Sequence, residues 1–154
     1  MISRAGIQTI KALLELSHEP TRWRSVSDLA TAQALPAPHL EQLLLRLRRA
    51  GVLEARRGRQ GGYRLAAPAE ELSLGRILAA AGAWPATGGR PSRVGAGSAI
   101  AEPDPATEHV ADLLRQRLAR AVERELDQLT LAELLFDLRS ARAGLSEEGG
   151  LMLG

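Results

Sequence analysis

Residues 56–66, RRGRQGGYRLA, place three arginines and three glycines directly before a tyrosine. Glycines beside positive charge can cradle the phosphates of a nucleotide, and they can equally form the tip of a hairpin that contacts a nucleic-acid backbone. The stretch matches neither the GxxxxGKS/T nor the GxGxxG pattern, and it precedes a β-compatible segment rather than a helix. No spacing of serine, histidine and acid recommends a catalytic triad, so we expect no enzyme.

The chain contains no cysteine among its 154 residues. This composition excludes disulfides, cysteine nucleophiles and any zinc site or iron–sulfur cluster with cysteine ligands, so we expect no such cofactor. No run of about 18 apolar residues occurs, and the first residues lack the apolar core of a signal peptide. We therefore expect a cytoplasmic protein that does not contact a membrane.

Positive charge is concentrated in the first part of the chain. Residues 1–64 hold 11 of the 20 Lys and Arg but 5 of the 18 Asp and Glu, although the net charge of the whole chain is only +2. A basic part joined to an acidic part is typical of a polyanion-binding module attached to a second unit. Because proteins that bind no nucleic acid show similar asymmetry, charge alone leaves the partner open.

The elements that must position the glycine–arginine stretch begin with three helices. A first helix, capped by Ser3, is predicted to run to about Ser17, and a second, short helix is predicted to start at Ser27 as its cap. The third has Pro36 or Pro38 in its first turn and ends near Gly51. Its buried face is predicted from leucines at helical spacing, namely Leu40, Leu43, Leu44 and Leu47.

After the third helix the period of the pattern changes from helical to alternating. A β-hairpin is predicted over about residues 52–66, and a short helix follows from Ser73 to about Ala81. Residues 82–105 hold five Gly and four Pro, which is typical of a flexible connection.

A long amphipathic helix is predicted from about Thr107. Thr130 and Glu133 form a capping box that begins another short helix of about eleven residues. The long helix cannot bury its apolar face in so small a module, so we expect it to pair with its own copy in a homodimer. The expected dimerisation residues are Val110, Leu114, Leu118, Val122, Leu126 and Leu129.

This order of elements predicts a mainly α fold with a small β-hairpin wing, that is, a winged helix-turn-helix followed by a long C-terminal dimerisation helix. The expected units are the DNA-binding domain at 1–81, a flexible linker at 82–106, dimerisation helices at 107–139 and a tail at 140–154. The 37–50 helix would enter the major groove of double-stranded DNA, and the 52–66 wing would contact the adjacent backbone or minor groove.

The segment HLEQLLLRLRRAGVLEARRGRQGGYRLAAPAEELSLGRIL resembles the signature of the Rrf-type winged helix-turn-helix transcriptional regulators. The resemblance is dense over residues 26–78 and weaker over 1–25 and 107–139. It implies a homodimeric regulator at the bacterial nucleoid that reads a palindromic operator. Repression is favoured over activation, and the direction of control is left open. A winged helix used for protein–protein contact is the alternative, and the arginines around the third helix and the wing favour DNA over it.

The resemblance implies roles for individual residues. Glu41 and Gln42 match the reading positions of the third helix, where a carboxylate can accept from a cytosine amino group. The alternative is that Glu41 balances the charge of nearby arginines. The full expected DNA-binding set is Arg4, Pro36, Ala37, His39, Glu41, Gln42, Arg46, Arg57, Arg59, Gln60, Gly61 and Gly62.

Cluster-binding members of the family carry three cysteines in the linker and a histidine just before the long helix. This chain has none of the cysteines, and His109 near the histidine position cannot hold a two-iron, two-sulfur cluster alone. The effector is left open among a small molecule, a metal on oxygen and nitrogen ligands, a partner protein, or none. Trp84 could cover a small-ligand pocket, or it could make a plain hydrophobic contact under the linker.

Overall fold

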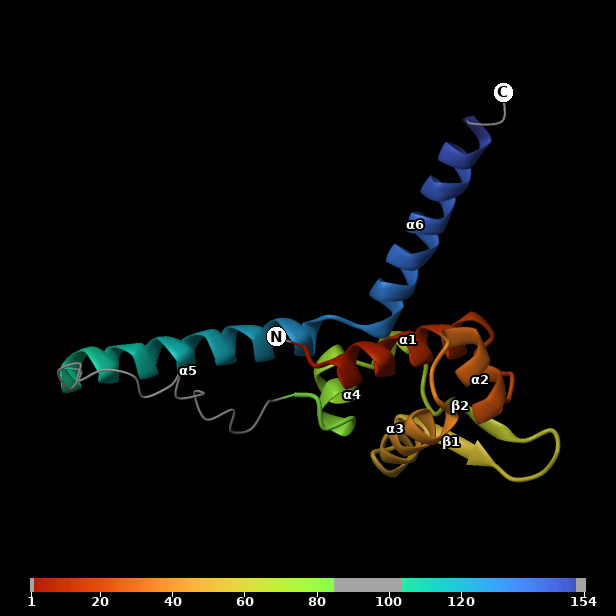
Figure 1. Cartoon of the computed structure of the whole chain (residues 1–154), viewed down its shortest axis with the longest axis horizontal. Coiled ribbons are helices and arrows are strands. Elements are labelled where there is room, and N and C mark those ends of the chain that lie inside the picture. Colours follow the sequence, from red (N-terminus) through yellow and green to blue (C-terminus); the bar gives the residue numbers. More distant parts are fainter. Residues whose placement is uncertain (1, 85–103, 152–154) are drawn as a thin grey trace.

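The structure is a computed structural model that describes residues 2–84 and 104–151 (Figure 1). Its elements are α1 (Arg4–His18), α2 (Val26–Gln33), α3 (Ala37–Arg49), β1 (Leu53–Arg56), β2 (Gly62–Leu65), the 3-10 helix η1 (Ala69–Glu71), α4 (Leu74–Ala80), α5 (Pro105–Gln128) and α6 (Leu131–Leu151). The predicted mainly α fold with one hairpin wing is therefore confirmed.

Serine side chains set the start of three helices. Ser3 Oγ accepts a hydrogen bond from the backbone N–H of Gly6, and Ser73 Oγ accepts from that of Arg76, as the sequence predicted. For α2 the prediction was wrong by two residues. The cap is Ser25, not Ser27, because the backbone of Ser25 is held in an extended conformation that turns its hydroxyl toward the helix.

Leucine side chains from α1, α2 and α3 build the core of the helix-turn-helix. The fully buried set consists of Leu13, Leu16, Leu29, Leu40, Leu44 and Leu47. The four leucines predicted for the inner face of α3 are all buried. This packing fixes which side of α3 faces outward, and that side is polar.

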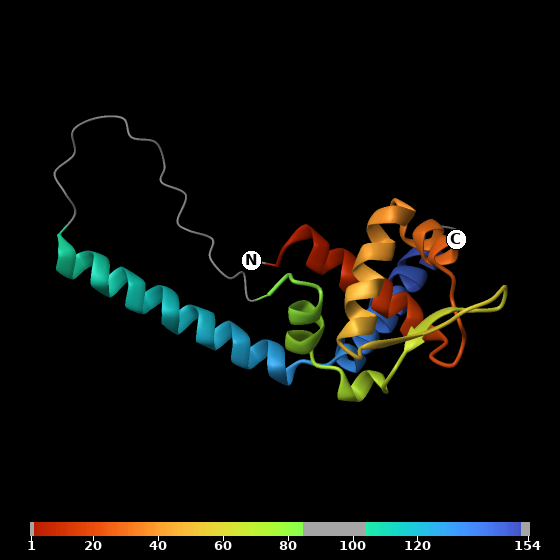
Figure 2. The ribbon, with the colours of Figure 1, turned by 90° about the horizontal axis from the view of Figure 1, so that it is seen from below.

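The wing pairs with the loop between α1 and α2 as well as with itself. β1 and β2 are antiparallel, with Leu53 opposite Leu65 and Arg56 opposite Gly62. An isolated bridge joins Arg24 to Tyr63, so residue 24 acts as a third, one-residue strand. Tyr63 is buried in the core, as the sequence predicted. Figure 2 shows the hairpin projecting beyond the helices.

The junction between α5 and α6 is joined to the winged helix by backbone hydrogen bonds. The N–H of Leu74 donates to the carbonyl of Leu129, and the N–H of Leu131 donates to that of Leu72, both at 2.8 Å. Leu126 and Leu131 are buried in the same core as the helix-turn-helix leucines. The predicted unit at 107–139 therefore does not stand apart, because residues 126–135 complete the N-terminal core.

The remaining predicted boundaries also shift. α5 begins at Pro105, and α6 continues to Leu151, so the structure places most of the expected tail at 140–154 in a helix. Alanines after residue 139 propagate the helix, and an interior glycine costs only about 1 kcal/mol. The expected linker lies largely outside the described residues.

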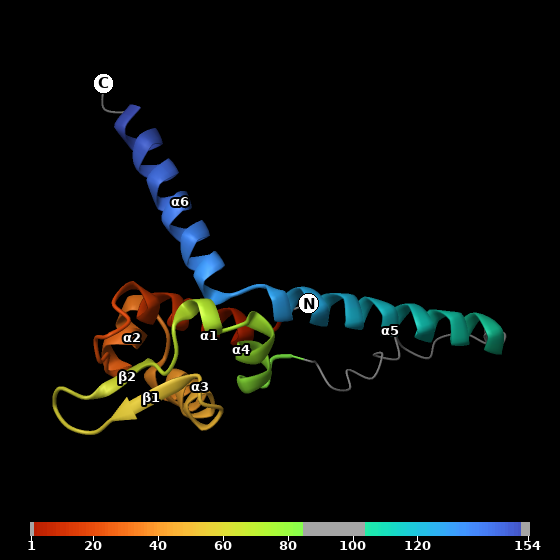
Figure 3. The ribbon, with the colours of Figure 1, turned by 180° about the vertical axis from the view of Figure 1, so that it is seen from behind.

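The two C-terminal helices leave the core in different directions. α5 and α6 both extend beyond the compact part of the molecule, whereas α3 and the wing lie on the side of α1 away from α6 (Figures 1 and 3). The side of the fold that carries α3 and the wing is therefore separate from both long helices. Within the described parts of the chain, no helix is both long and apolar enough to cross a membrane.

Candidate nucleic-acid interface

The outer face of α3 is polar and exposed. Residues two and nine positions along from Leu40 lie nearly opposite the buried leucines, because successive helical residues are about 100° apart. These positions are Gln42 and Arg49, and both are exposed. Gln42 is thus placed, as the sequence predicted, where a side chain on a helix can reach base edges in a major groove.

Glu41 and Arg48 lie together on one flank of α3, and both are exposed. No salt bridge to Glu41 occurs among the residues that the structure describes. Both interpretations of Glu41, a contact with a base and a charge that balances nearby arginines such as Arg48, stay predictions. Its carboxylate stands beside Gln42 on the surface that would meet DNA.

The N-terminal turn of α3 is tied to α1. His39 Nε2 and Gln8 Oε1 are 2.7 Å apart, so the imidazole donates to the amide oxygen. Arg4 lies one turn before Gln8 on α1 and is exposed. The sequence did not identify Gln8 as a site residue, although its four-residue spacing from Arg4 was a usable signal.

Pro36 and Ala37 open α3. Pro36 is the cap residue, with an extended backbone and no side-chain hydrogen bond, and Ala37 is the first helical residue. Both are exposed beside His39. Because Pro36 and Pro38 have no N–H, the first turn of α3 offers few backbone donors, and a phosphate contact there would depend on side chains.

Arg46 does not point freely outward. Its Nη1 donates to the carbonyl of Ala81 at 3.2 Å, which joins α3 to the C-terminal end of α4. A donor engaged in this way stabilises the packing of two helices. Arg46 is nevertheless exposed, so its expected contact with DNA stays a prediction.

The tip of the wing carries exposed arginines on a turn that requires glycine. Arg57, Arg59 and Gln60 are exposed. Gly58 has φ +113° and Gly62 has φ +138°, so these two supply the left-handed backbone. A Cβ on Gly61 would lie 2.1 Å from the carbonyl oxygen of Arg56. Gly61 is thus needed for the close approach of the two strands and not for a positive φ.

The base of the wing is stacked on a tryptophan. The Arg64 guanidinium lies 4.2 Å and that of Arg56 lies 5.9 Å from the centre of the Trp23 ring. Arg64 also pairs with Glu54 on the neighbouring strand and donates to the carbonyl of Thr21. Cation–π contacts of this kind hold the wing against the α1–α2 loop. No local pattern indicated a role for Trp23, since its partners Arg56 and Arg64 lie more than 30 residues away.

A largely buried ion pair stabilises the loop between α1 and α2. Arg24 Nη1 lies 3.3 Å from Glu15 Oε1, and only 14% of the Arg24 side chain is exposed. Gln33 at the end of α2 donates to the other carboxylate oxygen of Glu15. The loop, α1 and α2 are thereby joined beneath the wing, so the wing and the helix-turn-helix form one rigid surface.

The apolar face of α5 is bare. The exposed fractions are 63% for Val110, 39% for Leu113, 56% for Leu114, 57% for Leu118 and 41% for Val122. Leu126 is instead buried in the core of its own chain, and Leu129 packs against that core. Four of the six expected dimerisation residues are therefore available on α5, two are used within the chain, and Leu113 was missed.

The first turn of α5 is capped by an aspartate. Asp104 accepts hydrogen bonds from Thr107 Oγ1 at 2.9 Å and from the N–H of Ala106 at 3.3 Å. These bonds, that from the Thr107 hydroxyl first, hold the pKa of the Asp104 carboxyl below its ordinary value. His109 is exposed one turn later. The start of α5 is thus a capped helix end with its histidine directed to solvent.

Trp84 lies between α4 and α5 and packs against the core. Together with Gly75, Ala79, Glu123 and Asp127 it lines a small cavity of about 200 Å³. Its indole N–H has no hydrogen-bond partner among the described residues. Trp84 thus lines a cavity and also makes a hydrophobic contact, so the structure is compatible with both interpretations.

Comparison with known proteins identifies the family. Rrf2, described as an iron-dependent transcriptional regulator family, matches residues 2–137. A protein of Synechocystis sp. named as an HTH-type transcriptional regulator is 40% identical over 144 residues, which cover 90% of each chain. The solved structure of T. potens IscR has a TM-score of 0.65 at 27% identity and covers 92% of this chain and 90% of that one. CymR, the global cysteine regulator of B. subtilis, has a TM-score of 0.62 at 25% identity, covering 88% and 95% respectively.

Iron in the form of a cysteine-ligated cluster does not fit this chain, because its donor set contains no cysteine. Within residues 2–84 and 104–151, no three His, Asp or Glu side chains gather closely enough to hold a metal ion. The similarity to known regulators therefore rests on the helix-turn-helix, the wing and the C-terminal helices. On the match over residues 2–137 and the 40% identity to a full-length relative, the chain belongs to the Rrf2 family of transcriptional regulators.

Proposed function

We propose that this regulator is a homodimer that binds a palindromic operator in double-stranded DNA and represses transcription from it. The observation that carries the proposal is the placement of two exposed groups on one side of the molecule. The outer face of α3 presents Gln42 and Arg49, and the wing tip presents Arg57 and Arg59. Figure 1 shows α3 next to the hairpin.

These two groups suit different parts of a duplex. The major groove admits one helix, so Glu41 and Gln42 on α3 would contact base edges. Arginines on the wing tip would then meet the neighbouring backbone or the minor groove, where negative potential is concentrated. Arg4, Gln8 and His39, at the other end of α3, would contact phosphate on the opposite side of the groove.

The bare apolar face of α5 supports a dimer. Five large apolar side chains at helical spacing are 39% or more exposed, and an isolated helix with such a face is unstable in water. A second copy would cover this face with the same residues, as in a two-fold interface. Two reading surfaces related by that axis would match a palindrome.

A dimer of this kind would act by occupying the promoter, and this is the basis for proposing repression. Since its target is chromosomal DNA, we place it in the cytoplasm with the nucleoid. The test is immunoprecipitation of genomic DNA with tagged protein, comparing the native chain with an Arg57→Ala/Arg59→Ala variant. We expect discrete sites that share an inverted repeat and are lost in the variant. The proposal would be contradicted by the absence of discrete sites, which would favour a protein–protein module.

A further inference from the structure

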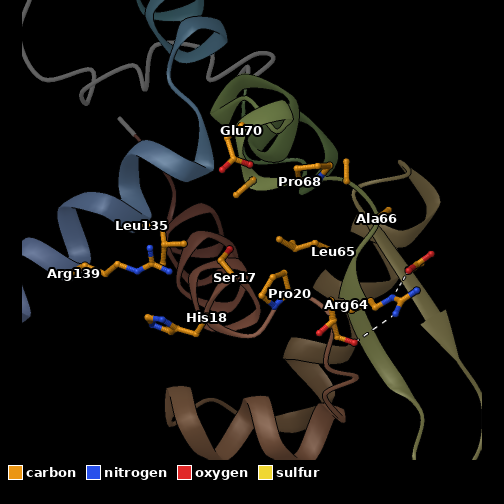
Figure 4. Close-up of a pocket in the computed structure, with 14 residues that line it drawn as sticks. Ser17, His18, Pro20, Arg64, Leu65, Ala66, Pro68, Glu70, Leu135 and Arg139 are labelled. Carbon is orange, nitrogen blue, oxygen red and sulfur yellow. Dashed lines mark hydrogen bonds and ion pairs between the residues drawn. The ribbon is translucent and has the colours of Figure 1, made fainter.

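A cleft of about 560 Å³ separates the base of the wing from α6 (Figure 4). Its walls come from the C-terminal end of α1, the strand β2, η1 and the first turns of α6. Small-molecule sites in proteins enclose about 300–1,000 Å³ and combine apolar walls with a few convergent polar groups. The size of this cleft lies within that range.

The middle of the cleft is apolar. Leu65 from β2, Leu135 from α6 and the rings of Pro20 and Pro68 line it. Leu65 and Leu135 are each 7% exposed, so they form a rigid floor rather than a loose surface. An apolar body of a few methylene groups would replace water on this floor.

Most polar groups in the walls already have partners. Ser17 Oγ donates to the carbonyl of Leu13 at 2.6 Å, and Arg64 is engaged with Glu54. His18 Nε2 lies 3.0 Å from Arg142 Nη1, and it accepts this hydrogen bond because a guanidinium only donates. None of these groups is free to bind a ligand strongly.

Two charged groups of opposite sign line the cleft without a salt bridge. Arg139 extends from α6 toward Ser17, and Glu70 lies on the neighbouring η1 (Figure 4). Neither makes a salt bridge with any described residue. Arg139 is the positively charged residue of α6 that lines the cleft. A guanidinium binds a carboxylate through two parallel hydrogen bonds.

We infer that this cleft is an effector site for a small amphipathic carboxylate. The carboxylate binds the guanidinium of Arg139, and the hydrocarbon body lies on Leu65, Leu135 and Pro20. Glu70 lies on η1, which contacts α6, so its negative charge is on the same side of the cleft as Arg139 and lowers the affinity for the carboxylate.

A ligand in this position would connect α6 to the wing. Glu54 and Arg64 form the wing side of the cleft, and Arg64 is the residue stacked on Trp23. Occupancy of the cleft therefore restrains the base of the wing, whose tip carries Arg57 and Arg59. This regulatory consequence rests on the proposed function, whereas ligand binding itself does not.

The binding test uses the full chain, isothermal titration calorimetry and two probes of equal length, hexanoate and hexylamine. We expect hexanoate to bind and hexylamine not to bind. Arg139→Gln should weaken hexanoate binding about tenfold or more, since hydrogen bonds to a charged group are lost. Glu70→Gln should strengthen it, because a repelling charge is removed. Arg115→Gln, on α5 outside the cleft, is the matched control and should leave the affinity unchanged.

Equal binding of the two probes, binding of neither, or hexanoate binding that is unaffected by Arg139→Gln would overturn the site. A second arm measures the affinity for duplex DNA with and without saturating hexanoate. We expect a shift in the native chain and none in Arg139→Gln. An unchanged affinity in the native chain would overturn the coupling to the wing while leaving the site, and failure to bind DNA without hexanoate would concern the proposed function alone.

Discussion

The backbones of Arg24 and Tyr63 exchange two hydrogen bonds. The N–H of Arg24 donates to the carbonyl of Tyr63 at 2.9 Å, and the N–H of Tyr63 donates to the carbonyl of Arg24 at 2.8 Å. This pair attaches the wing to the loop between α1 and α2, and therefore fixes the wing relative to α3. The wing and α3 consequently move together.

Gly62 is the residue that allows this approach. Its φ is +138°, and a Cβ there would lie 2.2 Å from the carbonyl oxygen of Arg24. We expect Gly62→Ala to lower the free energy of unfolding by about 3 kcal/mol or more, since it adds a backbone clash to a strained conformation. Gly58→Ala is the control, because Gly58 also has a positive φ but no atom lies within 4 Å of its Cβ position. Urea unfolding measures both variants. If Gly62→Ala and Gly58→Ala lower the free energy of unfolding equally, the pairing with Arg24 does not contribute to stability.

Trp23 should matter for DNA binding more than for folding. Removal of its ring in Trp23→Ala deletes the contacts with Arg56 and Arg64. Cation–π contacts contribute about 0.5–1 kcal/mol at exposed sites, so we expect a loss of about two- to fivefold in affinity for duplex DNA. Fluorescence anisotropy measures this loss, and Trp23→Phe, which keeps an aromatic face, should recover most of it. If Trp23→Phe is as weak as Trp23→Ala, the stacking explanation is wrong.

Arg57 and Arg46 should behave differently when each is replaced by alanine. Arg57→Ala removes an exposed wing-tip charge, so the affinity for DNA should fall and the slope of log K against log salt should decrease by about one. Arg46→Ala removes the bond to Ala81 and should lower the melting temperature instead, with the salt slope unchanged. If Arg46→Ala also lowers the slope of log K against log salt, Arg46 contacts DNA phosphate and this prediction is wrong.

The dimer interface is best tested on exposed residues of α5. Truncation before α5 would also delete Leu126 and Leu131 from the core, and would therefore unfold the chain. Leu114 and Leu118 are 56% and 57% exposed, so Leu114→Glu/Leu118→Glu should give a folded monomer. Sedimentation velocity measures the mass, and circular dichroism checks the fold. A dimer that persists in the folded variant would place the interface elsewhere.

Local patterns in the sequence were sufficient for most of the fold. Serine caps predicted the first two helices, and leucine spacing predicted the third with its inner face, since caps and helix period are properties of neighbouring residues. Thr130 and Glu133 form the predicted capping box, with Glu133 Oε2 accepting from the N–H of Thr130 at 2.8 Å. The glycine–arginine turn was correctly assigned to a hairpin because alternation begins at Tyr63.

Features that depend on distant partners could not be predicted in this way. The contact of Arg46 with Ala81 spans 35 residues, and that of His39 with Gln8 spans 31. The burial of Leu126 depends on a core made mostly by residues 10–83. A heptad-like pattern on α5 is the same whether a leucine faces a partner chain or its own core, so spacing alone could not separate the two roles.

The central claim is that α3 and the wing read a palindrome as a dimer. Selection of bound duplexes from a random-sequence pool, followed by affinity measurement at low and moderate salt, tests it most directly. We predict enrichment of an inverted repeat with half-sites about one helical turn apart, bound with an affinity that falls steeply as salt is raised from about 50 to 200 mM. Enrichment of no sequence, or an affinity insensitive to salt, would contradict the account.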